Sequence, residues 1–390
     1  MASVAHRVRK GFVFTLLAAL FTAGPAHAAA YTILDLGTLV GGTSSRAGGI
    51  NASGQTVGYG SVTDRPPVFH AFRTTATGTI DTAADIGTLG GTYGQAQGLN
   101  ASGQTVGFAT ATGSSYSRAF RTTATGIIDA ASDLGALAGT NSQADSINAS
   151  GQAVGFAITT ANGTAHAFRT TSTGMINAAA DLGTLGGSNS RALGINDSGQ
   201  TVGNAYTAGD LAYHAFRTTA TGMIDASTDL GTFGGSYSTA LGINDSGQTV
   251  GTAHLAGNKV RHAFRTTATG TIDASTDLGT LGGTATQANG INISGQTVGY
   301  SFTAGNALQD AFFVDTTGPM VDLNTLLPAG SGWALTTAQG INDSGQIVGY
   351  GIINGQEHAF RLTPTPEPAS LSIAMLGAMA LLRRARRRGV

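Results

Sequence analysis

The chain has 390 residues, of which 59 are glycine, 11% are charged and none is cysteine. Glycine at about 15% is roughly twice its usual share, and so few charges disfavour a helical bundle, which needs polar helix faces. The lack of cysteine excludes disulfides, zinc–thiolate sites and cysteine nucleophiles.

Residues 1–28 have the three parts of a secretory signal peptide. A basic start at residues 7–10 precedes an apolar stretch. Ala26 and Ala28 supply the small residues that signal peptidase needs, so cleavage is expected after Ala28. An uncleaved membrane anchor is disfavoured because the apolar stretch is short for a membrane span.

The other end of the chain carries a second targeting pattern. The motif Pro366, Glu367, Pro368 precedes an apolar run and a basic cluster that begins with Arg383 and Arg384. This order resembles the PEP-CTERM sorting signal of bacterial exported proteins. The resemblance implies recognition by an exosortase, transient membrane contact through the apolar run and cleavage near the motif. A simple C-terminal membrane tail is the alternative.

These patterns divide the chain into four parts: 1–28 as signal peptide, 29–362 as repeats, 363–368 as linker, and 369–390 as apolar segment with its arginine tail. The two ends carry eight of the 20 basic residues, so residues 29–382 have a net charge of about −9. An acidic, exported domain is not expected to bind nucleic acid or anionic lipid.

Between the ends, one unit of about 48 residues occurs seven times, and three markers define it. The motif Asn-x-Ser-Gly-Gln begins at Asn51, Asn100, Asn148, Asn196, Asn244, Asn292 and Asn342. The motif x-Ala-Phe ends at Phe72, Phe120, Phe168, Phe216, Phe264, Phe312 and Phe360. The motif Asp-Leu-Gly-Thr-Leu, or a variant of it, begins at Asp35, Asp85, Asp133, Asp181, Asp229, Asp277 and Asp322.

Each unit is predicted to form four short strands, with tight turns at Ser-Gly and at Ala-Thr-Gly. The fourth strand is expected to run from the Ile-Asp pair through Asp-Leu-Gly-Thr-Leu. Seven four-stranded units predict an all-β, seven-bladed β-propeller. Because the last unit lacks a fourth strand, Tyr31–Leu39 is expected to supply it and close the ring. A β-solenoid or two smaller sheets are the alternatives.

The markers also resemble those of HAF-repeat proteins, a family of extracellular repeat proteins. His70-Ala71-Phe72 and its copies ending at Phe168, Phe216, Phe264 and Phe360 match the family motif, whereas Arg118 and Asp310 replace the histidine in two units. The resemblance implies export and repetition and no particular reaction.

The repeated polar residues have structural explanations. Asn-x-Ser matches a glycosylation pattern, but turn chemistry accounts for it. The Asn-Asp-Ser-Gly copies carry too few oxygen ligands for calcium, so no metal or other cofactor is expected. Each repeated histidine is expected to be hydrogen-bonded between blades. The repeated aspartate is expected to accept backbone N–H groups that tie one blade to the next.

The connections between the second and third strands differ from unit to unit, so this face is the candidate binding face. Its candidate residues are Asp64, Arg65, Asp210, Lys259, Trp333 and Glu357. Trp333, the single tryptophan, follows a five-residue insertion and either stacks on a sugar ring or fills an irregular junction between blades.

No phosphate loop, nucleophile elbow or HExxH motif appears, and no catalytic residue is assigned. The sequence therefore predicts a non-enzymatic propeller at the cell surface or in a biofilm matrix. Its expected partners are signal peptidase and exosortase during export, and then exopolysaccharide or other surface proteins. The alternative is a polysaccharide hydrolase or lyase, which needs a pair of acid–base groups.

Overall fold

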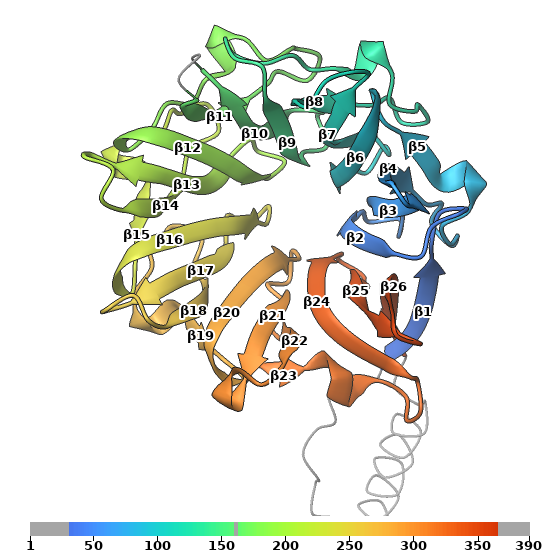
Figure 1. The fold of residues 1–390 in the computed structure, drawn as a ribbon. Helices are drawn as coiled ribbons and strands as arrows, with labels where there is room; N and C mark the ends of the chain where they lie inside the picture. Colours follow the sequence, from blue (N-terminus) through green and yellow to red (C-terminus); the bar gives the residue numbers. More distant parts are fainter. Residues whose placement is uncertain (1–30, 160–162, 366–390) are drawn as a thin grey trace, which may run out of the picture.

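The computed structural model describes residues 31–159 and 163–365. Its regular structure consists of strands and short 3-10 helices, and the described residues contain no α-helix (Figure 1). The strands form several sheets, none of which closes on itself. The predicted all-β class is confirmed.

Each repeat forms one unit of three consecutive antiparallel strands, and the units follow one another around a common centre (Figure 1). The first strands are β2 (Ser45–Ile50), β6 (Gly90–Leu99), β9 (Ser142–Ile147), β12 (Gly186–Ile195), β16 (Gly234–Ile243), β20 (Gly282–Ile291) and β24 (Trp333–Ile341). The second strands are β3 (Thr56–Asp64), β7 (Thr105–Ala111), β10 (Ala153–Ile158), β13 (Thr201–Thr207), β17 (Thr249–Leu255), β21 (Thr297–Thr303) and β25 (Ile347–Ile353). The third strands are β4 (Pro67–Arg73), β8 (Ser117–Arg121), β11 (Ala165–Arg169), β14 (Tyr213–Arg217), β18 (Arg261–Arg265), β22 (Gln309–Val314) and β26 (Gln356–Pro364).

The fourth strand is shorter than predicted. It is β5 (Asp85–Gly87), β15 (Asp229–Gly231), β19 (Asp277–Gly279) or β23 (Val321–Asp322) in four units, and a single bridge at Asp133 or Asp181 in two others. Short helices take the place of its predicted start: η1 (Thr82–Ala84), η2 (Ala130–Ser132), η3 (Ala178–Ala180), η4 (Ala226–Thr228) and η5 (Ala274–Thr276). The physical reason is capping, because an Asp or Asn side chain before each helix accepts a backbone N–H from it. Two further short helices are η6 (Ala304–Asn306) and η7 (Leu323–Leu326).

The last unit receives its fourth strand from the start of the described chain. Strand β1 (Tyr31–Gly37) pairs antiparallel with β26, in a register that sets Tyr31 opposite Pro364. The predicted pairing of this N-terminal segment with the last unit is therefore present, although the strand ends two residues before Leu39.

A second cyclic connection runs through the repeated asparagines, which we call the asparagine ring. The side-chain Nδ2 of each asparagine donates to the backbone carbonyl of the asparagine in the next unit, over 2.9 to 3.2 Å. Asn342 donates in the same way to Asn51 and completes the cycle. Each Oδ1 accepts the N–H of the glutamine four residues on, so one side chain holds its own turn and the neighbouring unit.

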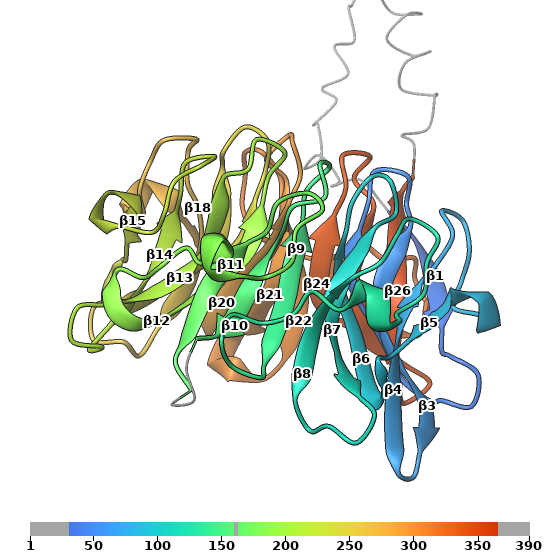
Figure 2. The ribbon, with the colours of Figure 1, turned by 90° about the horizontal axis from the view of Figure 1, so that it is seen from above.

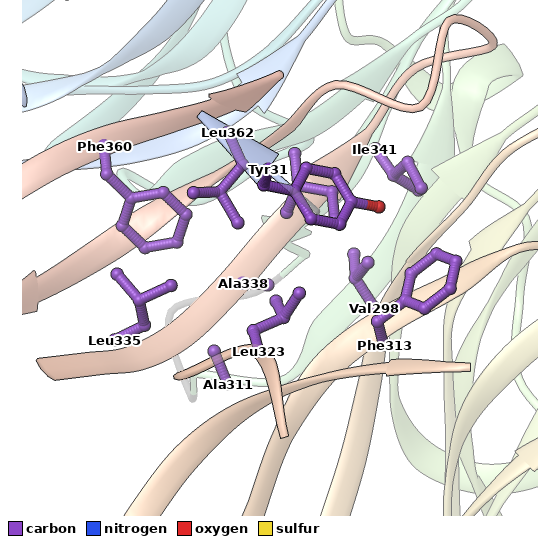
Figure 3. Packing of buried hydrophobic residues seen from close by; sticks show 11 residues of the cluster. Tyr31, Val298, Ala311, Phe313, Leu323, Leu335, Ala338, Ile341, Phe360 and Leu362 are labelled. Atoms are coloured by element: carbon purple, nitrogen blue, oxygen red, sulfur yellow. The ribbon is translucent and has the colours of Figure 1, made fainter. Parts of the chain in front are cut away.

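The core consists of separate clusters, each shared by two neighbouring units. The phenylalanine of every x-Ala-Phe motif is fully buried. The cluster of Figure 3 joins Val298 and Phe313 of unit six to Leu335 and Phe360 of unit seven, and the ring of Tyr31 of β1 lies edge-on to Phe313 at 6.5 Å. Burying one such side chain contributes about 1.5–3 kcal/mol, and here it stabilises the junction between units.

The two edges of the ring differ in what they carry (Figure 2). The described chain begins and ends at one edge, where Pro364 lies beside the Asn-Ser-Gly turn of the last unit at Gly345. The turns between second and third strands, such as the β3–β4 hairpin, lie at the opposite edge. We call these the terminal edge and the variable edge.

Candidate functional site

The centre of the ring holds a cavity of about 220 Å³. It is lined by the last three residues of the first strand of every unit, for example Gly194 and Ile195 preceded by Leu193. Most of these residues are glycine, isoleucine or leucine, so the cavity wall is largely backbone and apolar side chains. The residues differ in chemistry mainly at the first of the three positions; at the second, Ser146 is the one exception to glycine.

A wider cavity of about 410 Å³ adjoins it and is lined by the residues at the first of these three positions. In the seven units these residues are Gly48, Gln97, Asp145, Leu193, Leu241, Asn289 and Gln339. Arg191, Thr239, Gln287 and Asn204 complete the lining. We call this lining the polar mouth; the first strands of the repeats differ in chemistry at this position and also at the position of Arg191, two residues earlier.

Asp145 and Arg191 form a two-bond ion pair at the mouth. Arg191 Nη2 lies 2.6 Å from Asp145 Oδ1, and Nε lies 3.1 Å from Oδ2. The Asp145 side chain is only 6% exposed. Burial raises the pKa of Asp145, and Arg191 and Gln97 oppose that shift. Because the guanidinium already engages both carboxylate oxygens, the pair is suited to hydrogen bonding and not to proton transfer.

A side pocket of about 200 Å³ opens beside Arg191, between the third and fourth units. The guanidinium of Arg191 lies 4.9 Å from the ring centre of Phe156, a cation–π distance. Asn204 and Tyr206 form another wall. Among the described residues, none hydrogen-bonds the side-chain amide of Asn204, which lines the pocket.

A second side pocket, of about 280 Å³, lies between the seventh and first units. Arg46 pairs with Glu357 through bonds of 2.6 and 2.9 Å and lies 4.5 Å from the ring centre of Tyr350. The hydrogen bond to Glu357 is the main cause that raises the pKa of Arg46. Tyr59, with Phe69 and Tyr93, supplies aromatic walls whose ring centres are 5.7 to 6.1 Å apart.

The candidate residues predicted from sequence are not gathered into one site. Asp64, Arg65, Asp210 and Lys259 are exposed in three separate turns at the variable edge. The carboxylate of Asp210 accepts the N–H of Ser188, so it ties its turn to the first strand of the same unit.

The other two predicted candidates have different surroundings. Glu357 lies in the second side pocket, where it pairs with Arg46. Trp333 is half-buried against the core, with its ring edge-on to Phe360 of the same unit at 6.0 Å. Ala26 and Ala28, like the motif 366–368 and Arg383 and Arg384, lie outside the described residues.

The predicted roles of the repeated histidine and aspartate need correction. His214 Nδ1 lies 2.8 Å from Asp229 Oδ2, and both residues belong to the same unit. The same pair occurs in four other units at 2.9 to 3.0 Å. Asp229 also accepts the N–H of Gly231, two residues on. These groups therefore hold the third and fourth strands of one unit together, because both side chains extend from neighbouring strands of a single sheet.

Contacts between units are made instead by residues that the sequence analysis passed over. The arginine after x-Ala-Phe reaches into the next unit; Arg217, for example, donates to the carbonyls of Gly247 and Gly270. Ser238 accepts the N–H of Ala215 and donates to the carbonyl of Gly231 in the preceding unit. Their signal is present in the sequence, because arginine follows the phenylalanine in six units and serine recurs two residues before the first-strand alanine.

The side-pocket residues Arg46, Arg191 and Asp145 were also missed. Their signal is variation: they occupy first-strand positions where the other units carry different residue types. Sequence reasoning sought variation only in the turns and not within the strands.

Comparison with known families identifies one segment. Residues 364–388 match the PEP-CTERM protein-sorting motif. The motif implies an exported protein that is anchored in the membrane before exosortase processes it. No curated protein matches the chain.

Within the described part of the chain, no helix is long and apolar enough to cross a membrane. Nor do residues 31–159 and 163–365 bring three or more histidine or acidic side chains together in a way that would hold a metal ion.

Proposed function

We propose that residues 31–365 form a seven-bladed β-propeller that acts, after export, as a non-catalytic binding module at the cell surface or in the extracellular matrix. The asparagine ring and the β1–β26 pairing support this fold, because both connect the last unit to the first. The resemblance of the repeat markers to HAF-repeat proteins fits the same setting.

The ligand class that the site favours is exopolysaccharide. Sugars are bound by planar amides and charged groups that hydrogen-bond hydroxyls, and by aromatic rings that pack on the sugar face. The polar mouth supplies Gln97, Asn289 and Gln339, and the side pockets supply aromatic rings and arginines. This combination at the divergent part of the repeats is the observation that carries the proposal.

The position of the sorting motif supports an outward-facing site. The matched motif begins at residue 364, which lies at the terminal edge, so membrane anchoring before processing would turn that edge toward the membrane. The variable edge then points away from the membrane. The side pockets involve residues that precede the three cavity-lining positions of the first strands, on the side toward the variable edge.

The test uses the exported protein purified from the cells that secrete it. It is mixed with the exopolysaccharide of the same cells, and both co-sedimentation and newly formed reducing ends are measured, with and without EDTA. Retention without new ends is the expected result. New reducing ends would support the hydrolase or lyase alternative, and the absence of retention would refute polysaccharide binding.

A further inference from the structure

The two side pockets occupy the same position in different repeats. Strand register pairs Arg46 with Tyr59 in unit one and Arg191 with Asn204 in unit four. Each arginine follows a serine that contacts the preceding unit, Ser45 or Ser190. The pockets are therefore two versions of one inter-unit groove, three units apart on the ring.

Both grooves share a feature that the other five lack. At the arginine position the remaining units carry Gln95, Gln143, Thr239, Gln287 and Thr337. In both grooves the guanidinium crosses to the preceding unit, lies over its second-strand aromatic ring, and pairs with one of its carboxylates. The pairing fixes a flat donor group in place and cancels its charge locally.

We infer that these two grooves are equivalent subsites for neutral sugar residues, so that one polysaccharide is held at two points of the ring. This rests on the proposed function and adds the number of sites and the class of sugar. An acidic sugar is expected to bind no more tightly than a neutral one, because each arginine is already paired with a carboxylate. Small-molecule clefts commonly span about 300–1,000 Å³, so pockets of 200 and 280 Å³ suit a single sugar ring.

Two sites also change how a polymer is retained. Once one groove holds a chain, the second binding step is intramolecular, and avidity can exceed the affinity of one site by about 10²–10⁴-fold. Short fragments that fill one groove at a time are expected to bind weakly, with two fragments for each protein chain.

The chain supplies its own matched substitutions for a test. Unit six carries Gln287, Asn289 and Gln309 where the grooves have arginine, aspartate and glutamate. One variant is R46Q/E357Q, and the other is R191Q/D145N. Each changes a charged pair together, so that no buried charge is left unpaired. The control Q143T changes the same strand position in unit three, at a residue that lines neither the polar mouth nor a side pocket, and unfolding midpoints verify that all three proteins fold.

The experiment measures calorimetric binding of three- to four-residue fragments of the exopolysaccharide, and retention by the intact polymer, using the exported protein. We expect two fragments per wild-type chain, one per groove variant, and polymer affinity reduced by about 10²-fold in each variant. Affinity is expected to change less than about twofold between 50 and 500 mM salt, since the sites carry no net charge.

Three results would overturn the inference. They are a single fragment site in the wild type, two sites remaining in a groove variant, or a steep loss of affinity with salt. If the wild type binds polymer while both groove variants bind it equally well, the proposed function stands and the paired subsites are refuted. If the wild type binds no polymer, both are refuted.

Discussion

The side-chain Nδ2 of Asn342 donates a hydrogen bond of 3.1 Å to the backbone carbonyl of Asn51, 291 positions away in the chain. The six other joints of the asparagine ring use the same bond between residues 48 to 50 positions apart. The joint between the two ends of the array is therefore built like every other joint.

Asn342→Asp tests this joint. The substitution keeps an oxygen that accepts the N–H of Gln346 and removes the donor to Asn51. We expect the free energy of unfolding in urea to fall by about 1–3 kcal/mol, because the Asn51 carbonyl keeps only the N–H of Gly54 as a donor and faces a carboxylate oxygen in place of the amide N–H. The control Asn354→Asp lies in an exposed turn. Equal unfolding free energies for the two variants would contradict a role of the ring in stability.

Gly203→Ala tests the close approach of the first and second strands. A Cβ at this position would lie 1.9 Å from the carbonyl oxygen of Arg191. We expect a loss of at least about 3 kcal/mol in the free energy of unfolding, because the backbone must move apart. Gly209→Ala in the same unit meets no atom within 4 Å but has a φ of +83°. Its cost is expected to be about 1–2 kcal/mol, and a larger loss for Gly209→Ala would reverse our interpretation.

One unit of the chain already carries a different residue in place of the histidine of the histidine–aspartate pair. In unit two, Arg118 replaces the histidine and pairs with Asp133 at 3.3 Å. His214→Arg is therefore expected to change the unfolding free energy by less than about 0.5 kcal/mol. Asp229→Ala is expected to cost more, about 1 kcal/mol, since the N–H of Gly231 also loses its acceptor. Thermal unfolding of both variants shows which substitution lowers stability more. A larger loss for His214→Arg than for Asp229→Ala would contradict the prediction.

In unit six, Asp310 replaces the histidine, so the pair consists of two carboxylates, Asp310 and Asp322. Burial, and secondarily the negative charge of Asp322, raise the pKa of Asp310. A raised pKa means that folding favours the protonated form, so this contribution to stability declines as pH rises from about 4 through the raised pKa. Asp310→Asn is expected to stabilise the protein at pH 7 by less than about 1 kcal/mol and to have little effect at pH 3.

Urea unfolding at both pH values measures that difference. Asp229→Asn is the matched control, because its carboxylate pairs with His214 and not with a second carboxylate. It is expected to lower stability at pH 7. A stabilising effect of Asp310→Asn that is as large at pH 3 as at pH 7 would show that charge repulsion is not its cause.

The repeat markers made the strand content and the end-to-end pairing predictable, because both follow from spacing and from the missing fourth strand of the last unit. The fully buried Phe216 was predictable for the same reason, as a recurring apolar residue in a strand. The short helix η4 was not, since Asp225 acts as a cap only once the chain has turned.

The side pockets were beyond the sequence analysis for a different reason. Asp145 and Arg191 are 46 residues apart, and only the stacking of neighbouring units brings them within 2.6 Å. Recurring residues indicate how units join, and the departures from recurrence indicate where the units differ in chemistry. The turns attracted attention because their lengths vary, whereas a changed side chain inside a regular strand leaves the spacing intact.

The β1–β26 pairing sets the order of events during secretion. Strand β1 emerges among the first segments of the chain, and its partner begins at Gln356, more than 300 residues later. Until that partner arrives, β1 has an unpaired edge open to other strands. The sorting motif begins at residue 364, which is the last residue of this strand pairing, opposite Tyr31. The pairing can therefore form only after the residues directly before the sorting motif have been exported, so that completion of the last unit and membrane retention depend on adjacent residues.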